Sequence, residues 1–180
     1  LTMGVKKIFV MPDINDLTRQ AREDVHGKIE VEILRLGNID QASTSTLAAE
    51  IMEQKGVDCI ITLGGDGTNR AVAKRIKKVP LLPISTGTNN VFPNFIEGTI
   101  AGIAAGAYAS RMKDKKQLVI KSKKFEVSVN EKLKDLALID IAVVKIPFLG
   151  ARAVWDTNNL QELFLTRSEV MNIGLSSIGA

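Results

Sequence analysis

Cysteine, histidine and aromatic side chains are scarce in this 180-residue sequence, which has one Cys, one His and 4% aromatic residues. A single cysteine, Cys59, excludes an internal disulfide framework, so a reducing interior is the default expectation. The only histidine, His26, has no second His or Cys with which to form a structural zinc site, and we assign no metal ligand. So few aromatic rings also disfavour the stacking platforms of proteins that bind single-stranded nucleic acid.

The sequence also lacks a long apolar run. The longest uncharged apolar stretch, residues 99–109, is far shorter than the roughly 20 residues that span a bilayer. Lysines interrupt the first ten residues, where a signal peptide would be apolar. We therefore expect a soluble, cytoplasmic protein with no membrane partner.

The net charge is only +4, and much of it comes from lysines in one stretch: Lys113, Lys115, Lys116, Lys121, Lys123 and Lys124. Such a local cluster suits an anionic substrate or a solvated surface better than sequence-specific recognition of nucleic acid. We expect a small anionic ligand and no nucleic-acid partner.

Strand-like and helix-like patterns alternate in residues 1–116. Apolar or alternating runs predict strands at 5–11, 29–36, 57–63 and 79–84. Helical spacing predicts helices at 14–25, 47–55, 68–76 and 95–112, the second of them capped by hydroxyls of residues 43–46 and ended by Gly56. This alternation predicts an α/β domain with a Rossmann-like parallel sheet and helices on both faces.

From residue 117 onward, the pattern changes to short strands. We predict antiparallel strands at 118–120, 125–129 and 136–144, with hairpin turns near Ser122-Lys123 and Asn130-Glu131. Three strands make a thin sheet with exposed edges, which needs more chain or a partner to cover it. Residues 117–180 are therefore predicted to be a β-rich and incomplete C-terminal domain.

The most specific local pattern is the glycine motif, Gly64-Gly65-Asp66-Gly67-Thr68, between a predicted strand and a predicted helix. Three glycines in four positions let the backbone turn sharply and approach a ligand closely. A helix that begins near Thr68 directs its free N–H groups at the same point, which favours a phosphate. Asp66 would repel that phosphate unless it binds Mg²⁺ or accepts a proton from an attacking hydroxyl. Alternatively, the motif is a tight turn in which Asp66 caps the helix.

A second polar cluster follows the next predicted strand, again before a predicted helix. It consists of Ser85, Thr86, Gly87, Thr88, Asn89 and Asn90, our further candidates for nucleotide or phosphate binding. The carboxyl ends of neighbouring parallel strands meet at one edge of a sheet, so the two clusters are expected side by side. Ser85 and Thr86 suit a phosphate, whereas the two asparagines suit a ribose or base edge. The alternative for this cluster is a capped helix start.

The spacing matches neither a P-loop nor the dinucleotide-binding fingerprint. A Gly-Gly-Asp-Gly-Thr sequence after a buried strand resembles the signature shared by NAD kinases, diacylglycerol and sphingosine lipid kinases, and phosphofructokinases. With STGTNNVFP at 85–93, GARAVWD at 150–156 and GLSSIGA at 174–180, the chain resembles the acetoin-catabolism protein X branch of the NAD-kinase-like superfamily. This resemblance spans nearly the whole chain.

The resemblance implies an N-terminal α/β nucleotide-binding domain at 1–116, a β-rich domain at 117–180, and an active site in the cleft between them. It implies ATP and Mg²⁺ as cofactors, with NAD as a possible substrate. Asp66 would activate the attacking hydroxyl, while the motif glycines and Thr68 would hold the phosphates. Relatives associate through their β-rich domains, so we expect a homo-oligomer, with Phe125 and Val127 at the contact.

One stretch departs from the family pattern. NAD kinases carry an Asn-Glu or Asn-Asp pair entering a later strand, whereas this chain has Ala137-Leu138-Ile139-Asp140. Asp140 is retained as a candidate substrate-binding acid, but Ile139 replaces the amide, so the phosphate acceptor is NAD or a different small alcohol. Arg152 either clamps a substrate phosphate or is a surface arginine.

The sequence therefore favours an ATP-dependent small-molecule kinase of the NAD-kinase-like type. Ile139 and the short second domain favour an alternative, a catalytically inactive protein that binds a nucleotide as a sensor. A lipid kinase ranks lower, because no amphipathic apolar helix or membrane anchor is evident.

Overall fold

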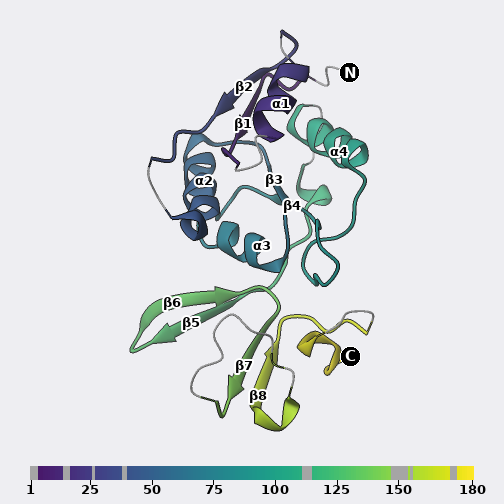
Figure 1. Ribbon diagram of the computed structural model, residues 1–180. Helices are drawn as coiled ribbons and strands as arrows, with labels where there is room; N and C mark the ends of the chain where they lie inside the picture. The colour runs from purple at the N-terminus through teal and green to yellow at the C-terminus, as the bar shows by residue number, and fades with distance from the viewer. Residues whose placement is uncertain are drawn as a thin grey trace.

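The computed structural model describes residues 4–13, 17–25, 27–37, 40–110, 115–146, 154, 156–170 and 174–180. Figure 1 shows one part that contains helices α1 to α4 with strands β1 to β4, and a second part built from strands β5 to β8. The expected fold class, an α/β region followed by a β-rich region, is confirmed. The boundary near residue 117 stays a prediction.

The four strands of the first part form two parallel pairs. β1 (Lys7–Val10) pairs with β2 (Glu30–Ile33), and β3 (Ile60–Leu63) pairs with β4 (Leu81–Ile84). The predicted parallel pairing is confirmed, but among the described residues the ladders form two two-stranded sheets instead of one continuous sheet. Each of the four strands has only four residues. Because neighbouring strands are twisted relative to one another, such short strands offer little length for hydrogen bonding between the two pairs.

The four helices lie where the apolar spacing predicts them. They are α1 (Leu17–Asp24), α2 (Gln41–Lys55), α3 (Asp66–Ala73) and α4 (Gly98–Ser110). At the start of α2, the side chain of Asp40 accepts the Ser43 N–H at 2.9 Å, so this carboxylate replaces the predicted hydroxyl cap. Gly56 ends α2 at φ 67°, as predicted. In the described part of the chain, no helix is long and apolar enough to cross a membrane.

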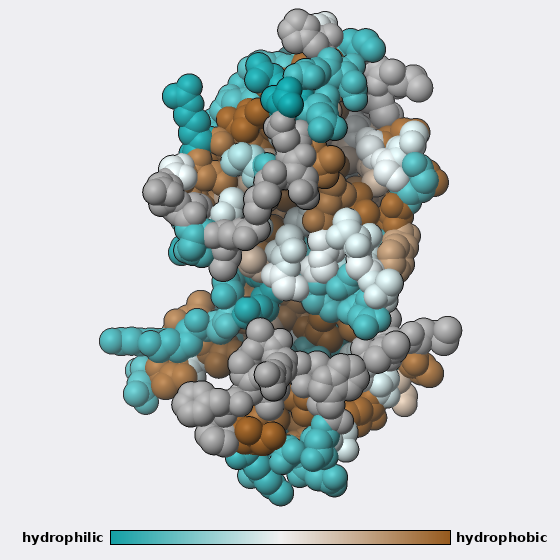
Figure 2. Space-filling view, viewed as in Figure 1, coloured by the Kyte–Doolittle hydropathy of each residue, from teal (hydrophilic) through white to brown (hydrophobic). Residues whose placement is uncertain are grey.

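The core lies on both sides of α2. Ala48 packs with Leu34 and Leu36, whereas the next residue, Ala49, packs with Ile60 and Val72. The predicted helical cover on both faces is wrong for β3, because Ile61 and Leu63 on its other face are 44% and 68% exposed. Figure 2 shows hydrophobic side chains at the surface in both parts of the molecule.

The second part consists of two antiparallel strand pairs. β5 (Phe125–Val129) pairs with β6 (Lys132–Ala137), and β7 (Asp140–Val144) pairs with β8 (Leu160–Leu165). The predicted turn at Asn130-Glu131 is confirmed, with both residues at positive φ, as a tight hairpin turn requires. The short 3₁₀ helices are η1 (Lys115–Leu118), η2 (Thr157–Asn159) and η3 (Leu175–Ser177).

Three predictions for the second part are wrong. Leu118 ends η1 and residues 119–124 are irregular, so neither the strand at 118–120 nor the hairpin at Ser122-Lys123 forms. The predicted strand 136–144 is interrupted at Leu138 and Ile139, whose carbonyls accept the Thr166 hydroxyl at 2.6 and 3.0 Å. β8 was not predicted, because its alternation is short and uses Leu and Phe instead of β-branched residues.

The expected oligomer contact stays a prediction. Phe125 and Val127 are half-buried, and the Phe125 ring packs edge-on against Phe164 at a centroid distance of 6.5 Å. On this hairpin the exposed apolar side chains are Val129 and Leu133. Phe125 is therefore partly used within the chain, and the structure contains no partner chain that would test the contact.

An ion-pair cluster joins α3 to β6. One oxygen of Asp135 lies 2.7 Å from the Arg70 guanidinium, and the other lies 2.9 Å from the Lys74 ammonium. Burial raises the pKa of Asp135, but hydrogen bonds from Lys74, the Leu136 N–H and Arg70 outweigh it and lower the pKa to about 2. The helix that carries the glycine motif is thus tied to the β-rich part.

Replacing Asp135 by asparagine should lower stability in a pH-dependent way. The folded pKa lies below the unfolded value of 3.8, so the stabilisation is present above that value and is lost as pH falls toward 2. Because the pair is partly exposed, we expect a loss of roughly 0.2–1 kcal/mol near pH 7. Urea unfolding from pH 7 to pH 2 measures it, with Glu126→Gln on β5 as the control. If the variant and the wild type differ in free energy of unfolding by the same amount at every pH, the charge of Asp135 does not contribute to stability.

Candidate functional site

The two polar clusters lie side by side, at the carboxyl ends of β3 and β4. Leu63, the last residue of β3, is in register with Ile84, the last residue of β4. The ladder continues one step into the glycine motif, where the Gly64 N–H donates to the Ile84 carbonyl at 3.0 Å. The predicted juxtaposition is therefore what the structure shows.

Asp66 holds the loop that follows the second cluster. Its Oδ1 accepts the N–H groups of Val91 and Phe92 at 3.1 and 2.8 Å, and its Oδ2 accepts the Val91 N–H at 3.1 Å. α3 begins at Asp66 itself, and its N-cap, Gly65, makes no side-chain cap. The alternative in which Asp66 only caps the helix is thus wrong, because its carboxylate bonds a different segment.

Asn90 connects the two clusters. Its Oδ1 accepts the Asp66 N–H at 3.3 Å, while its Nδ2 donates to the Ser85 hydroxyl at 2.9 Å. Ser85 in turn donates to the Gly87 carbonyl at 2.9 Å and is buried. Asn90 and Ser85 were predicted to touch a ligand. In the structure these hydrogen bonds instead hold the two clusters together.

Two of the three motif glycines are needed by the fold. A Cβ on Gly64 would lie 2.5 Å from Thr68 Oγ1 and 2.7 Å from Thr68 Cβ, and one on Gly65 would lie 2.5 Å from Asn90 Oδ1. By contrast, a Cβ on Gly67 would meet no atom within 4 Å. Because Gly64 and Gly65 have no Cβ, the side chains of Thr68 and Asn90 fit beside them. Of the three motif glycines, only Gly67 leaves open space beside the first turn of α3.

Several members of the two clusters are exposed. Gly67, Thr86, Thr88 and Asn89 are exposed, whereas Thr68 is half-buried against Gly64. The second cluster is not a helix start, since irregular chain runs from Ser85 to Glu97 before α4 begins. Within this stretch the Ser85 N–H donates to the Asn94 carbonyl at 2.8 Å. The exposed backbone and hydroxyls are therefore the groups available to a ligand.

Asn69 is a residue of the site that sequence reasoning missed. It is fully buried, its Oδ1 accepts the Thr62 hydroxyl at 2.7 Å, and its Nδ2 donates to the Gly65 carbonyl at 2.8 Å. This fixes the motif backbone to β3. The sequence signal that could have identified Asn69 is an amide side chain one helical turn after Gly65, on the face of α3 that lies toward the sheet.

Arg167 is a second residue that the sequence did not single out. Its guanidinium lies over the Phe92 ring, 5.0 Å from the centroid, and donates to the Ser122 hydroxyl at 2.8 Å. Phe92 belongs to the loop held by Asp66, so Arg167 connects this loop with the β-rich part. No motif spacing could have found a contact between residues this far apart in the chain.

Asp140, the first residue of β7, lies within electrostatic reach of Asp66. Burial raises the pKa of Asp140 above its usual range, and the Asp66 carboxylate raises it further. Asp140, one of the predicted substrate-binding residues, is half-buried. The other, Arg152, lies outside the described residues.

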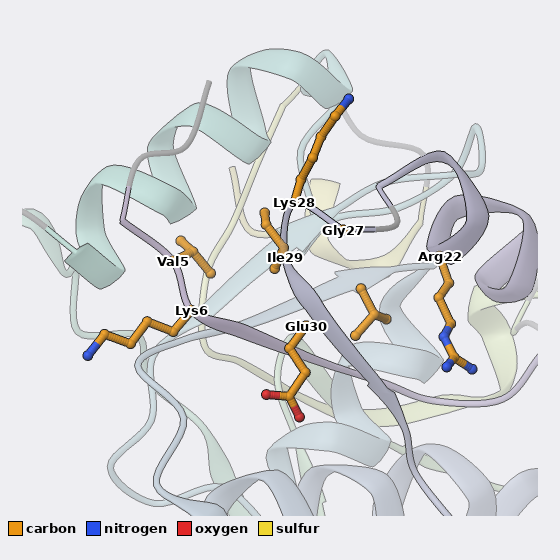
Figure 3. A pocket seen from close by; sticks show the side chains of 8 residues that line it. Val5, Lys6, Arg22, Gly27, Lys28, Ile29 and Glu30 are labelled. Atoms are coloured by element: carbon orange, nitrogen blue, oxygen red, sulfur yellow. The ribbon is translucent and has the colours of Figure 1, made fainter.

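Two cavities lined by described residues lie away from the two polar clusters. One of about 530 Å³ is lined by β1, β2 and neighbouring residues, including Lys6, Arg22 and Lys28. Figure 3 shows the charged ends of these three side chains pointing away from one another, so they do not converge on an anion. Another, of about 430 Å³, lies between β2 and α2. Neither of these two cavities includes the glycine motif.

Comparison with known families agrees with this geometry. The ATP-NAD kinase N-terminal domain family matches residues 15–113, which include both polar clusters. The chain belongs to the NAD-kinase-like superfamily. The acetoin catabolism protein X C-terminal domain family matches residues 123–180. The NAD-kinase-like match thus covers β2 to β4 but not β1, and the second match covers β5 to β8.

One curated relative of this NAD-kinase-like chain is the acetoin catabolism protein X of Cupriavidus necator. It is 34% identical over 187 aligned residues, which cover 97% of this chain and 52% of the relative. The chain therefore spans about half the length of the curated relative that it matches. No solved structure matches the chain.

The donors for a metal ion are few at this NAD-kinase-like site. In the parts of the chain that the structure describes, no group of three or more His, Cys, Asp or Glu side chains could hold a metal ion. Mg²⁺ often binds proteins through one or two carboxylates together with substrate phosphates.

Proposed function

We propose that this chain binds a nucleoside triphosphate at the glycine motif and transfers its γ-phosphate to a hydroxyl of NAD or of another small alcohol. The observation that carries the proposal is the open space at Gly67, beside the first turn of α3. The N–H groups at a helix start and the positive end of the helix dipole attract phosphate. Membership of the NAD-kinase-like superfamily supports ATP as the donor.

The frame around this space is rigid enough to position a phosphate. Asn69 fixes the motif to β3, while Asp66 and Asn90 fix the second cluster to the motif. Thr86, Thr88 and Asn89 stay exposed at the same edge. In phosphoryl transfer the protein contributes mainly positioning and charge stabilisation, which such a preformed frame supports.

The geometry also favours a second candidate, a sensor that binds nucleotide without transferring phosphate. The side chains of Asp66, Ser85 and Asn90 all form hydrogen bonds to other groups of the protein. Ile139 stands where NAD kinases carry an amide. If the internal bonds persist in the complex, these residues hold the site together and take no part in chemistry.

A thermal-shift experiment followed by a transfer assay tests the proposal. A ligand at 100 times its Kd adds about 2.7 kcal/mol of stability, which in a chain of this size raises Tm by about 5–10 °C. We expect that shift with MgATP and a much smaller one with AMP, which lacks the β- and γ-phosphates. Mass spectrometry then detects phosphate transfer to NAD and to glycerol.

The outcomes separate the candidates. A MgATP shift with a phosphorylated product supports the kinase. A MgATP shift with no product after hours supports the sensor. If neither MgATP nor NAD shifts Tm, both candidates are wrong.

A further inference from the structure

Two contacts join the β-rich part to the two polar clusters. The first is the ion pair of Asp135 on β6 with Arg70 and Lys74, which ends on α3, the helix of the glycine motif; Figure 1 shows α3 next to the hairpin of β5 and β6. The second is the guanidinium of Arg167, which lies 5.0 Å from the centroid of the Phe92 ring, in the loop after the second cluster. The β-rich part therefore contacts both halves of the site.

The backbone around Arg167 is fixed on both sides. Before it, the Thr166 N–H donates to the Ile139 carbonyl at 2.8 Å, and after it, the Glu169 N–H donates to the Ser176 carbonyl at 3.2 Å. Ser176 is itself buried. The side chain of Arg167 thus extends from a short segment whose position the β-rich part has already set.

The guanidinium of Arg167 is held in place while it lies on the ring. Its Nη2 donates to the Ser122 hydroxyl at 2.8 Å, and its Nη1 lies 3.9 Å from a carboxylate oxygen of Glu169. The side chain is only 29% exposed. A planar, always charged guanidinium is the group best suited to stack on an aromatic face. Arg167 therefore presents a fixed cation to Phe92.

Phe92 is in turn bonded to the glycine motif. Its backbone N–H donates to Asp66 Oδ1 at 2.8 Å, and the Val91 N–H donates to both oxygens of the same carboxylate at 3.1 Å. Asn90, directly before these two residues, bonds the Asp66 N–H and the Ser85 hydroxyl. A contact that fixes the Phe92 ring thus also fixes the donors of Asp66 and the end of the second cluster.

We propose that Arg167 is a positioning residue of the site, which clamps Phe92 and thereby holds the second cluster and Asp66 in place for a nucleotide. This inference rests on the proposed function. Arg167 acts through Phe92 and takes no part in the making or breaking of bonds. The ion pair of Asp135 remains when this clamp is removed, so the β-rich part stays joined to α3 and the variant should fold.

The test compares Arg167→Gln with the wild type in the full chain, at temperatures well below Tm. Lys55→Gln is the matched control, because the Lys55 ammonium also lies over a phenylalanine ring, that of Phe9, at 4.7 Å from the centroid. In Arg167→Gln we expect the amides of Val91 and Phe92 to exchange faster and the Kd for MgATP to rise about 10-fold. Transfer to NAD or glycerol should fall about 10²-fold. The control should keep all three at wild-type values.

A second variant shows whether the contact itself is responsible. Phe92→Leu removes the ring but keeps the backbone N–H that Asp66 accepts. It should reproduce the losses of Arg167→Gln. The double variant should lose no more than the larger of the two single losses, because both substitutions remove the same contact.

The outcomes decide the role of Arg167 separately from the proposed function. If Arg167→Gln binds MgATP and transfers phosphate as the wild type does, even with a lower Tm, the arginine is structural and the inference is wrong. It is also wrong if the two single losses multiply in the double variant. If the wild type binds MgATP but phosphorylates neither NAD nor glycerol, the kinase function fails, and the change in MgATP affinity alone decides the role of Arg167. A wild type that does not bind MgATP overturns both proposals.

Discussion

Replacing Asp66 by asparagine is expected to lower phosphate transfer by about 10²-fold or more and to release the loop of Val91 and Phe92. The asparagine retains one acceptor oxygen but turns an N–H₂ group toward backbone N–H donors, so at least one of the present bonds is lost. Hydrogen bonds to a charged group contribute about 1.5–3 kcal/mol. A misplacement of about 1 Å in the second cluster is enough for a rate loss of about 10²-fold.

Hydrogen exchange distinguishes the two roles that Asp66 could have. If Asp66 is a positioning residue, the amides of Val91 and Phe92 should exchange faster in Asp66→Asn. Asp156→Asn is the matched control, because Asp156 also accepts a backbone N–H, that of Asn158 at 3.0 Å, in the β-rich part. It should lose local protection but keep full transfer. If Asp66→Asn loses transfer while both amides stay protected, Asp66 is the base that the family resemblance implies.

Replacing Gly67 by alanine is expected to preserve the fold and to weaken MgATP binding about 10–100-fold. The new methyl group meets no protein atom within 4 Å. Alanine also favours an exposed helix position over glycine by about 0.5–1 kcal/mol. In the complex, however, the methyl group would occupy the space proposed for the phosphate, and such overpacking costs about 1–3 kcal/mol.

Gly64→Ala provides the contrast. Its Cβ would lie within 3 Å of three side-chain atoms of Thr68, two of them carbons close to the backbone, so this variant should lose stability by about 1–3 kcal/mol. Tm and calorimetric titration with MgATP measure both variants. If Gly67→Ala binds MgATP as tightly as the wild type, the open space at Gly67 is not the phosphate site.

The glycine motif was readable from the sequence because its physical requirements are local. Glycines, an acid and a following helix occur within a few residues, and β3 precedes them directly. The second cluster was likewise readable, since parallel neighbours place their carboxyl ends together. The individual roles were less readable, because Asn90 and Ser85 are engaged by groups that only folding brings near.

The wrong predictions concern segments whose conformation is set by residues far away in the sequence. A capped helix start was the alternative for residues 85–90, but the bonds of Asp66 to the following residues and the pairing of Ser85 with Asn94 hold this stretch as a loop. The strand predicted at 136–144 is divided because Thr166, almost thirty residues later, bonds its carbonyls. Local periodicity contains no information about such contacts.

The sequence by itself determined the order of strands and helices in the first part, the hairpin at Asn130-Glu131 and the position of the glycine motif. Those features follow from periodicity, turn chemistry and short-range sterics, which act between neighbouring residues. Only the tertiary structure decided that Gly64 and Gly65 make room for side chains, and that Asp66 bonds a loop. The physical reason is that burial and hydrogen-bond partners are set by residues far apart in the chain.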